Sequence, residues 1–275
     1  MKKIFLLFIT LLLADTARAE LKTDIKFAEA GDTNLMLDAF VPEGRGPLPT
    51  CILVHGGGFM KGDKQNNFKP LFEPLSKAGF TWFTINYRLA PQYRYPACVE
   101  DVESAIRWVK AHAAEYKADP QRIALIGESA GGHLVSLAGV RAKADTRVAV
   151  VVPFYAPHDL ELQAKQNQTT PLWAEALFGL KELNDASWKI LRDASPINHI
   201  HKDLPPYLLI HGTKDDKVPF EQSLKFQEKM KAAGNVCDLV VVEGGAHGIR
   251  GWEKIDPGYK DKMIAWLHVM LAAKH

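Results

Sequence analysis

Apolar and polar positions along residues 33–272 follow two alternating patterns. Short apolar runs such as CILV at 51–54 predict buried strands, because a strand covered on both faces lacks polar alternation. Between these runs, apolar residues recur three or four positions apart, which predicts amphipathic helices. Strands are expected at 33–41, 51–54, 80–86, 123–126, 147–153, 208–210 and 238–242, and helices at 70–78, 97–113, 129–142, 221–233 and 259–272.

This order predicts an α/β fold with a mostly parallel central sheet and helices on both faces. Residues 155–203 interrupt the rhythm after the strand at 147–153, taken as the sixth of the fold although the pattern marks only five up to that point, and a stretch this long is an insertion rather than a plain crossover. We expect a cap-like segment that covers the strand ends. Its Trp188 is expected only to pack the insertion onto the sheet, whereas Trp173 could equally pack there or face the site.

Residues 1–19 have the layout of a secretory signal peptide. A basic start, Met1–Lys3, precedes the apolar run Ile4–Ala14, and Ala17–Ala19 fits a cleavage pattern. The run is too short to cross a hydrocarbon core of about 30 Å. We therefore expect cleavage after Ala19, export to the periplasm or the medium, and one domain over residues 20–275.

The charge of the chain depends on this leader. Cleavage would remove Lys2, Lys3, Arg18 and Asp15 and lower the formal net charge from +2 to zero. No cluster of Lys and Arg remains, so we expect neither a nucleic-acid partner nor a membrane partner after cleavage.

The chain has three cysteines, Cys51, Cys98 and Cys237. They are too few for a disulfide framework, and their spacing fits no zinc motif. One disulfide remains open as an alternative outside the cytoplasm.

Residues 127–131, Gly-Glu-Ser-Ala-Gly, fit the pattern G-x-S-x-G between a predicted strand and a predicted helix, which is the context that the motif requires. The sharp turn strains the serine backbone and leaves no room for side chains at its flanks. Amides at a helix N-terminus also favour developing negative charge. Ser129 is therefore predicted to be a nucleophile rather than a helix N-cap.

Three consecutive glycines in His55-Gly56-Gly57-Gly58-Phe59 end an early strand. Glycines expose backbone N–H groups, and acyl transfer needs such donors where the tetrahedral oxyanion forms. The amide of Ala130, directly after the nucleophile, would be a further donor. His55 is predicted to orient this loop, and a merely flexible turn is the alternative.

A serine nucleophile also needs a base and an acid. The loop HGTKDDKVP after a predicted strand offers Asp215 and Asp216, and on chemistry either could hold a histidine. Of the ten histidines, only His247 follows a predicted strand after both the serine and these acids, in a glycine-rich loop. Histidine is the natural general base for a serine hydroxyl. The order Ser, Asp, His is that of α/β-hydrolases.

Four motifs, HGGGF, NYRLAP, GESAGG and HGTKDDKVP, together resemble α/β-hydrolases of the hormone-sensitive-lipase type, close to bacterial acetyl esterase/lipase-like secreted esterases. The resemblance covers nearly all of residues 33–272. It implies the α/β-hydrolase fold and an acyl-serine mechanism without metal or cofactor. It places the acid at Asp215 and the oxyanion-hole amides at Gly57, Gly58 and Ala130. Where the family commonly continues NYRLAP with Glu, this chain has Gln92.

The resulting prediction is a secreted carboxylesterase for short acyl chains, with acetyl or feruloyl esters of plant polysaccharides as candidate substrates. Only residues 20–54 would precede HGGG, which leaves no room for the long N-terminal caps of many relatives. An amidase or formamidase, a small peptidase and a binding module without catalysis remain alternatives.

Arg88 and Asp101 are expected to form a structural ion pair. Pockets are mostly apolar, and the candidates for the wall are Phe59, Tyr155, Trp173 and Trp252.

Overall fold

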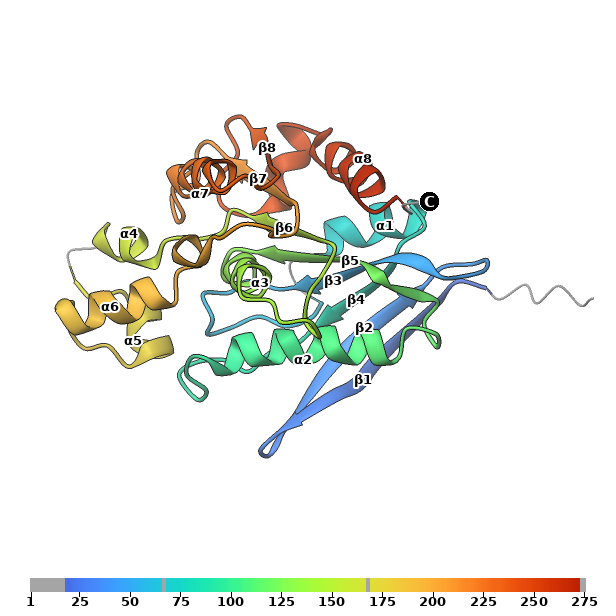
Figure 1. The fold of residues 1–275 in the computed structure, drawn as a ribbon, viewed down its shortest axis with the longest axis horizontal. Coiled ribbons are helices and arrows are strands. Elements are labelled where there is room, and N and C mark those ends of the chain that lie inside the picture. The colour runs from blue at the N-terminus through green and yellow to red at the C-terminus, as the bar shows by residue number, and fades with distance from the viewer. Residues whose placement is uncertain (1–17, 66–67, 167–168, 273–275) are drawn as a thin grey trace, which may run out of the picture.

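The computed structural model describes residues 18–65, 68–166 and 169–272. Its strands form one sheet in the order β1-β2-β4-β3-β5-β6-β7-β8 (Figure 1). The strands are β1 (Glu20–Ala30), β2 (Thr33–Val41), β3 (Leu48–Val54), β4 (Thr81–Ile85), β5 (Ala118–Glu128), β6 (Val150–Phe154), β7 (Tyr207–Gly212) and β8 (Cys237–Val242). The helices are α1 (Lys69–Lys77), α2 (Ala97–Ala111), α3 (Ala130–Val140), α4 (Leu160–Lys165), α5 (Leu172–Phe178), α6 (Asp185–Asp193), α7 (Glu221–Ala232) and α8 (Tyr259–Met270), with 3₁₀ helices η1 (Pro196–His199) and η2 (Ile249–Lys254).

The sheet is parallel from β4 to β8, and β2 runs antiparallel to both β1 and β4. Every residue of β4, β6 and β7 is buried, as the continuous apolar runs predicted. The α/β-hydrolase fold is therefore confirmed. Because all the parallel strands point the same way, the segments that follow β3, β5, β7 and β8 meet at one edge of the sheet.

The hydrophobic pattern did not predict β1. Its sequence, ELKTDIKFAEA, is rich in charge, and Phe27 is the one residue of the strand that is fully buried. β1 is an edge strand, which is paired with a neighbour on one side only. The sequence of such a strand shows little regular alternation of apolar and polar residues. With β1 counted, the insertion at 155–203 follows the sixth strand.

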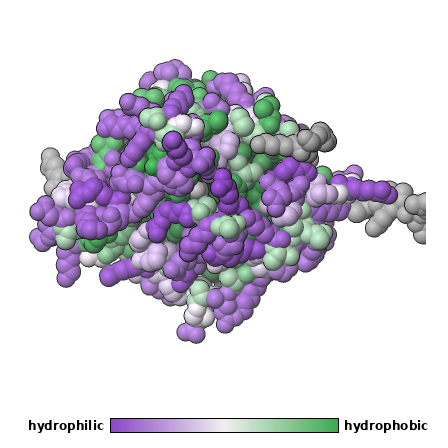
Figure 2. Space-filling model, viewed as in Figure 1, coloured by the Kyte–Doolittle hydropathy of each residue, from purple (hydrophilic) through white to green (hydrophobic). Residues whose placement is uncertain are grey.

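The helices cover the sheet on both faces (Figure 1). One core packs α2, α3 and α7 against the sheet, and a second packs α1 and α8 against the opposite face. All residues of α3 are buried, because the helix contacts β5, β6, α2 and η1. Figure 2 shows that the surface on this side is mostly hydrophilic, as expected when the apolar side chains fill these layers.

The insertion contains α4, α5, α6 and η1. It has a small core of its own, formed by Leu160, Ala164, Ala174, Leu180, Leu191 and Ala194. Trp188 packs against this core rather than onto the sheet as expected, because the insertion buries apolar side chains of its own, and the Lys165 ammonium lies 5.5 Å from the centre of its ring. In Figure 1, α5 and α6 lie beside the sheet layers, at the left of the view.

Arg88 and Asp101 form the predicted ion pair. The Arg88 guanidinium lies 2.7 Å from Asp101 Oδ1, and the Arg88 amide donates to Oδ2 at 2.8 Å. Asp101 is buried on α2. The pair therefore holds the segment after β4 against that helix.

The cysteines and the N-terminal segment complete the comparison with the sequence. Cys51, Cys98 and Cys237 are buried and free, so the disulfide left open above is not formed. The predicted signal peptide lies outside the described residues except for Arg18 and Ala19. No helix among the described residues has the length and apolar character needed to cross a bilayer.

The buried Lys64 allows a test of how the first strands are held. Its ammonium lies 2.6 Å from Asp38 and 2.9 Å from Asp24, and the side chains of Lys64 and Asp38 are 7% and 6% exposed. Lys64→Met should lower the free energy of unfolding by about 3 kcal/mol or more, because it leaves the Asp38 carboxylate buried without a counter-ion. Urea unfolding measures this change.

Lys77→Met is the matched control. Lys77 pairs with Glu73 on an exposed helix face, where both side chains are about three-quarters exposed. This variant should lose less than about 0.5 kcal/mol. Equal losses in the two variants would contradict a structural role for the buried ion pair.

Candidate active site

The turn between β5 and α3 places Ser129 in a strained backbone conformation, with φ 53° and ψ −118°. A Cβ atom on Gly127 would lie within 3.0 Å of the Gly131 carbonyl, and one on Gly131 within 3.0 Å of the Val54 carbonyl. Both flanks must therefore be glycine, as the motif predicted. The Ser129 amide donates to the Phe154 carbonyl at 3.0 Å, which ties the turn to β6.

Three of the predicted residues form a chain of hydrogen bonds. Ser129 Oγ lies 2.9 Å from His247 Nε2, and His247 Nδ1 lies 2.7 Å from Asp215 Oδ2. Because an ionised carboxylate only accepts, Nδ1 carries the proton and donates to Asp215. Nε2 is then free to accept from the Ser129 hydroxyl. This is the arrangement of nucleophile, base and orienting acid in serine hydrolases.

The structure decides between the two aspartates. The Asp215 side chain is fully buried, and its Oδ1 accepts hydrogen bonds from the amides of Lys217 and Val218 at 2.9 and 2.8 Å. Burial alone would raise the pKa of Asp215, but hydrogen bonds from His211 and His247 outweigh it and hold the pKa well below its usual range. Asp216 is 68% exposed and pairs with Lys217. Asp215 therefore faces His247, whereas Asp216 is exposed and lines the cavity without contacting His247.

The glycine loop after β3 lies beside this chain. Gly57 and Gly58 have φ of +112° and +63°, which favour glycine, and a Cβ on Gly57 would overlap the Lys61 carbonyl. The Gly57 carbonyl accepts from the amides of Met60 and Lys61, which closes the loop into a turn. Within the described residues, the amides of Gly57, Gly58 and Ala130 donate to no acceptor. They are available to a ligand.

His55 supports this loop instead of acting as a second base. Its ring stacks on Tyr87 at 4.3 Å, and its Nδ1 lies 2.7 Å from the Gly56 carbonyl. The Tyr87 hydroxyl donates to the His55 carbonyl at 3.0 Å. Burial lowers the pKa of His55 to about 4, so the ring is neutral at neutral pH. This agrees with the orienting role predicted for it.

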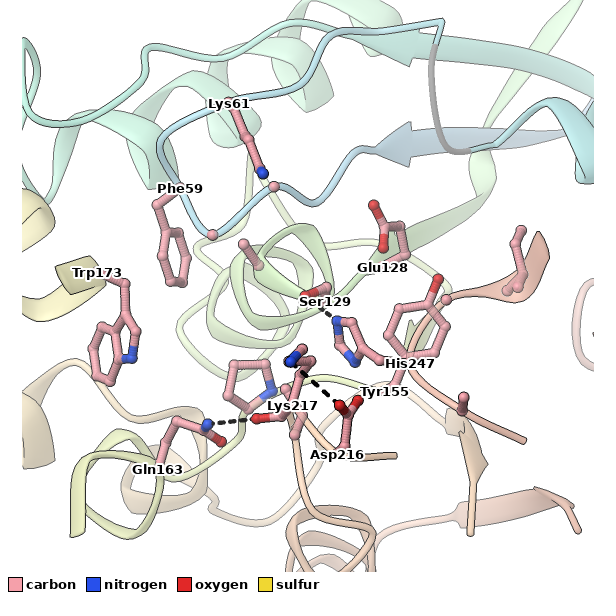
Figure 3. Close-up of a pocket in the computed structure, with 18 of the residues that line it drawn as sticks. Phe59, Lys61, Glu128, Ser129, Tyr155, Gln163, Trp173, Asp216, Lys217 and His247 are labelled. Carbon is pink, nitrogen blue, oxygen red and sulfur yellow. Dashed lines mark hydrogen bonds and ion pairs between the residues drawn. The ribbon is translucent and has the colours of Figure 1, made fainter. Parts of the chain in front are cut away.

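A cavity of about 1000 Å³ opens above Ser129 and His247. All four predicted wall residues line it: Phe59, Tyr155, Trp173 and Trp252. Figure 3 shows Phe59 and Trp173 on one side of Ser129, and Tyr155 on the other side beside His247. The two sides provide separate apolar surfaces, as the acyl and alcohol parts of an ester would require.

Sequence analysis missed several wall residues. Leu160, Gln163 and Leu172 come from the insertion, Arg250 and Ile255 from the η2 region, and Lys61 and Glu128 from the loop and strand ends. None has a motif of its own, and only the packing of these segments shows that they meet. In the part of the chain that the structure describes, no three His, Cys, Asp or Glu side chains are grouped as metal ligands would be.

A family model matches most of the chain. The BD-FAE model covers residues 37–230, which include the glycine loop, Ser129 and Asp215. The chain belongs to the BD-FAE family. His247 lies beyond the matched range, so its assignment rests on the geometry above.

Curated relatives of this BD-FAE chain are esterases by name. It is 37% identical to the probable carboxylic ester hydrolase LipM of Mycobacterium tuberculosis, over 68% of the chain and 46% of that protein. It is 27% identical to the acetylxylan esterase of Xylanibacter ruminicola, over 98% of the chain and 55% of that protein. The chain thus spans about half the length of the curated relatives it matches.

Solved structures support the same fold over nearly the whole chain. A truncated carbohydrate esterase from gut microbiota is 26% identical, with a TM-score of 0.78, and the match covers 94% of this chain and 99% of that one. An esterase of Thermogutta terrifontis is 29% identical, with a TM-score of 0.73, over 92% of each chain.

The strain at Ser129 can be measured by comparing two variants that both lack its hydroxyl. Ser129→Gly should be more stable than Ser129→Ala by about 1 kcal/mol, because glycine tolerates the positive φ whereas alanine keeps the Cβ. Both variants remove the hydroxyl, so the difference reports the backbone alone. Thermal unfolding measures it, and equal stability would show that the turn stores no strain.

Proposed function

We propose that this protein is a serine carboxylesterase that hydrolyses short acyl esters. The observation that carries the proposal is the hydrogen-bonded chain Ser129–His247–Asp215 at the floor of the cavity, beside the available amides of Gly57 and Gly58. The esterase names of the relatives and of the structural neighbours support it.

In the first step, Ser129 Oγ attacks the ester carbonyl carbon while His247 Nε2 takes the hydroxyl proton. The carbonyl oxygen becomes an oxyanion, and the amides of Gly57, Gly58 and Ala130 donate to it. The Asp215 carboxylate stabilises the imidazolium that forms. The tetrahedral intermediate then collapses, His247 protonates the leaving alcohol, and the acyl group stays on Ser129.

In the second step, His247 takes a proton from water, and the resulting hydroxide attacks the acyl carbon. The same amides receive the second oxyanion. Collapse breaks the bond to Ser129 Oγ, which recovers its proton from His247, and the carboxylic acid leaves. The cycle consumes one water and needs only groups of this chain.

We infer a short or aromatic acyl group on a carbohydrate as the substrate class, acetyl or feruloyl esters of plant polysaccharides in particular. One relative is named an acetylxylan esterase and one neighbour a carbohydrate esterase. The aromatic rings of Phe59 and Trp173 on one wall suit a planar acyl group. None of the relatives reported above is named an amidase or a peptidase, so these alternatives gain no support.

The acyl preference is the direct test. Hydrolysis of p-nitrophenyl esters from acetyl to palmitoyl should peak between acetyl and butyryl, since one relative is named an acetylxylan esterase. Acetylated xylan and methyl ferulate would then separate the two polysaccharide esters. Steady-state kinetics on protein without residues 1–19 measures both series. A maximum at palmitoyl, or no ester hydrolysis, would contradict the proposal.

Three variants control this experiment. Ser129→Ala should abolish activity, and Asp215→Asn should lower kcat by about 10⁴-fold because the base loses its orienting acid. Asp216→Asn changes the neighbouring carboxylate, which lines the cavity but pairs with Lys217 and makes no hydrogen bond to His247, and should keep wild-type kcat. Activity that survives in Ser129→Ala would rule out the acyl-serine mechanism.

We also infer that residues 1–19 direct export to the periplasm or the medium, on the basis of their basic, apolar and small-residue segments. Expression of the full chain in a bacterial host should yield exported protein that begins at Glu20. N-terminal sequencing measures this directly, and protein retained in the cytoplasm with Met1 intact would contradict it.

A further inference from the structure

The residue before the nucleophile, Glu128, is a buried carboxylate that the mechanism above does not use. It is the last residue of β5 and is 5% exposed. Its Oε1 accepts a hydrogen bond of 2.6 Å from the amide of Gly56. Gly56 directly precedes Gly57, so this bond joins the nucleophile turn to the base of the glycine loop.

Gly56 lies in close contact with the Glu128 side chain. A Cβ atom on Gly56 would lie within 3.0 Å of both the carboxyl group and the backbone carbonyl of Glu128. The ends of β3 and β5 are therefore in direct contact at this point. The position of the loop follows the position of the carboxylate.

Glu128 also reaches the base through Tyr155. The Tyr155 ring is buried, lies edge-on to His247 with 4.8 Å between the ring centres, and meets Trp252 at 5.3 Å. Burial raises the pKa of Tyr155 well above its usual value, and the charge of Glu128 and its hydrogen bond with the hydroxyl raise it further. Figure 3 shows Glu128 above the Tyr155 ring and His247 beside that ring.

We infer that Glu128 is a positioning residue. It fixes the position of the glycine loop relative to Ser129 and, through Tyr155, the position of the His247 ring. This inference rests on the esterase function proposed above. Oxyanion donors and the base contribute fully only in the correct geometry, and misplacement by about 1 Å costs about 100-fold in rate.

The chemistry of the side chain explains why a carboxylate stands here. An ionised carboxylate has two oxygens that only accept, so one can receive the Gly56 amide and the other the Tyr155 hydroxyl. Hydrogen bonds to a charged acceptor are short and strong. A shorter side chain in the same place would not span the two partners. An amide of the same length would, because its oxygen accepts from Gly56 and its nitrogen can donate to the Tyr155 oxygen.

Glu128→Ala, Glu128→Asp and Glu128→Gln separate length from charge. Glu128→Ala and Glu128→Asp should lower kcat on p-nitrophenyl acetate by about 100-fold, with KM within about threefold of wild type. Glu128→Gln should keep kcat within about fivefold of wild type, since it retains both links. Tyr155→Phe, which removes one link, should lower kcat by about fivefold.

The rate at which a fluorophosphonate labels Ser129 should fall in step with kcat, because this reaction uses the same oxyanion donors and the same base. Thr81→Val controls for stability. It removes a buried hydrogen bond to the Tyr116 carbonyl at the other end of the sheet. This variant should unfold at a lower temperature with unchanged kcat.

The outcomes distinguish this inference from the proposed function. The positioning role would be overturned by wild-type kcat in Glu128→Ala, by equal activity of Glu128→Asp and Glu128→Gln, or by a change in KM alone. In each of these cases Ser129 would remain essential. An inactive wild type, or an active Ser129→Ala, would instead remove the proposed function. If Glu128→Ala does not fold, the comparison of Glu128→Asp with Glu128→Gln and Tyr155→Phe decides.

Discussion

The close approach of β3 and β5 at the edge of the sheet is the constraint on which the site depends. A Cβ on Gly131 would come within 3.0 Å of the Val54 carbonyl, and one on Gly56 within 3.0 Å of Glu128. The chain can approach this closely only where glycine, which has no Cβ, stands at these positions. This contact places the serine turn next to the glycine loop, so that the proposed nucleophile and the proposed oxyanion donors have fixed positions relative to the sheet.

The strain at Ser129 accompanies that contact, whereas the charge of Asp215 is stabilised separately, in the loop after β7. The hydrogen bond from the Ser129 amide to the Phe154 carbonyl and the packing of α3 hold the turn, so Ser129 keeps its positive φ. Fully buried Asp215 would be costly as an ion alone, but hydrogen bonds from two backbone amides and His247 stabilise its charged form. Burial lowers the pKa of His55 to about 4, so this ring is a weaker base than an ordinary histidine.

Much of the fold and nearly all of the candidate triad could be predicted from the sequence because their determinants are local. Apolar runs mark strands buried on both faces, and the glycines at 127 and 131 mark a turn that admits no side chain. Strand β1 could not be predicted, since an edge strand with one buried residue has no clear pattern. The motif also left Glu128 as an unassigned position, because its partners Gly56 and Tyr155 are far away in sequence.

Local and distant determinants also differ between the proposed chemistry and the substrate range. The groups proposed to react stand at strand ends, where the hydrogen-bonded sheet fixes the backbone to within a narrow range. The cavity walls are built differently: Leu172 and Trp173 come from an insertion with its own small core, and Ile255 from the end of η2. A change in how those segments pack would reshape the cavity and leave Ser129, His247 and Asp215 in place. Acyl preference can therefore diverge among relatives that share all four motifs, and it must be measured on this chain.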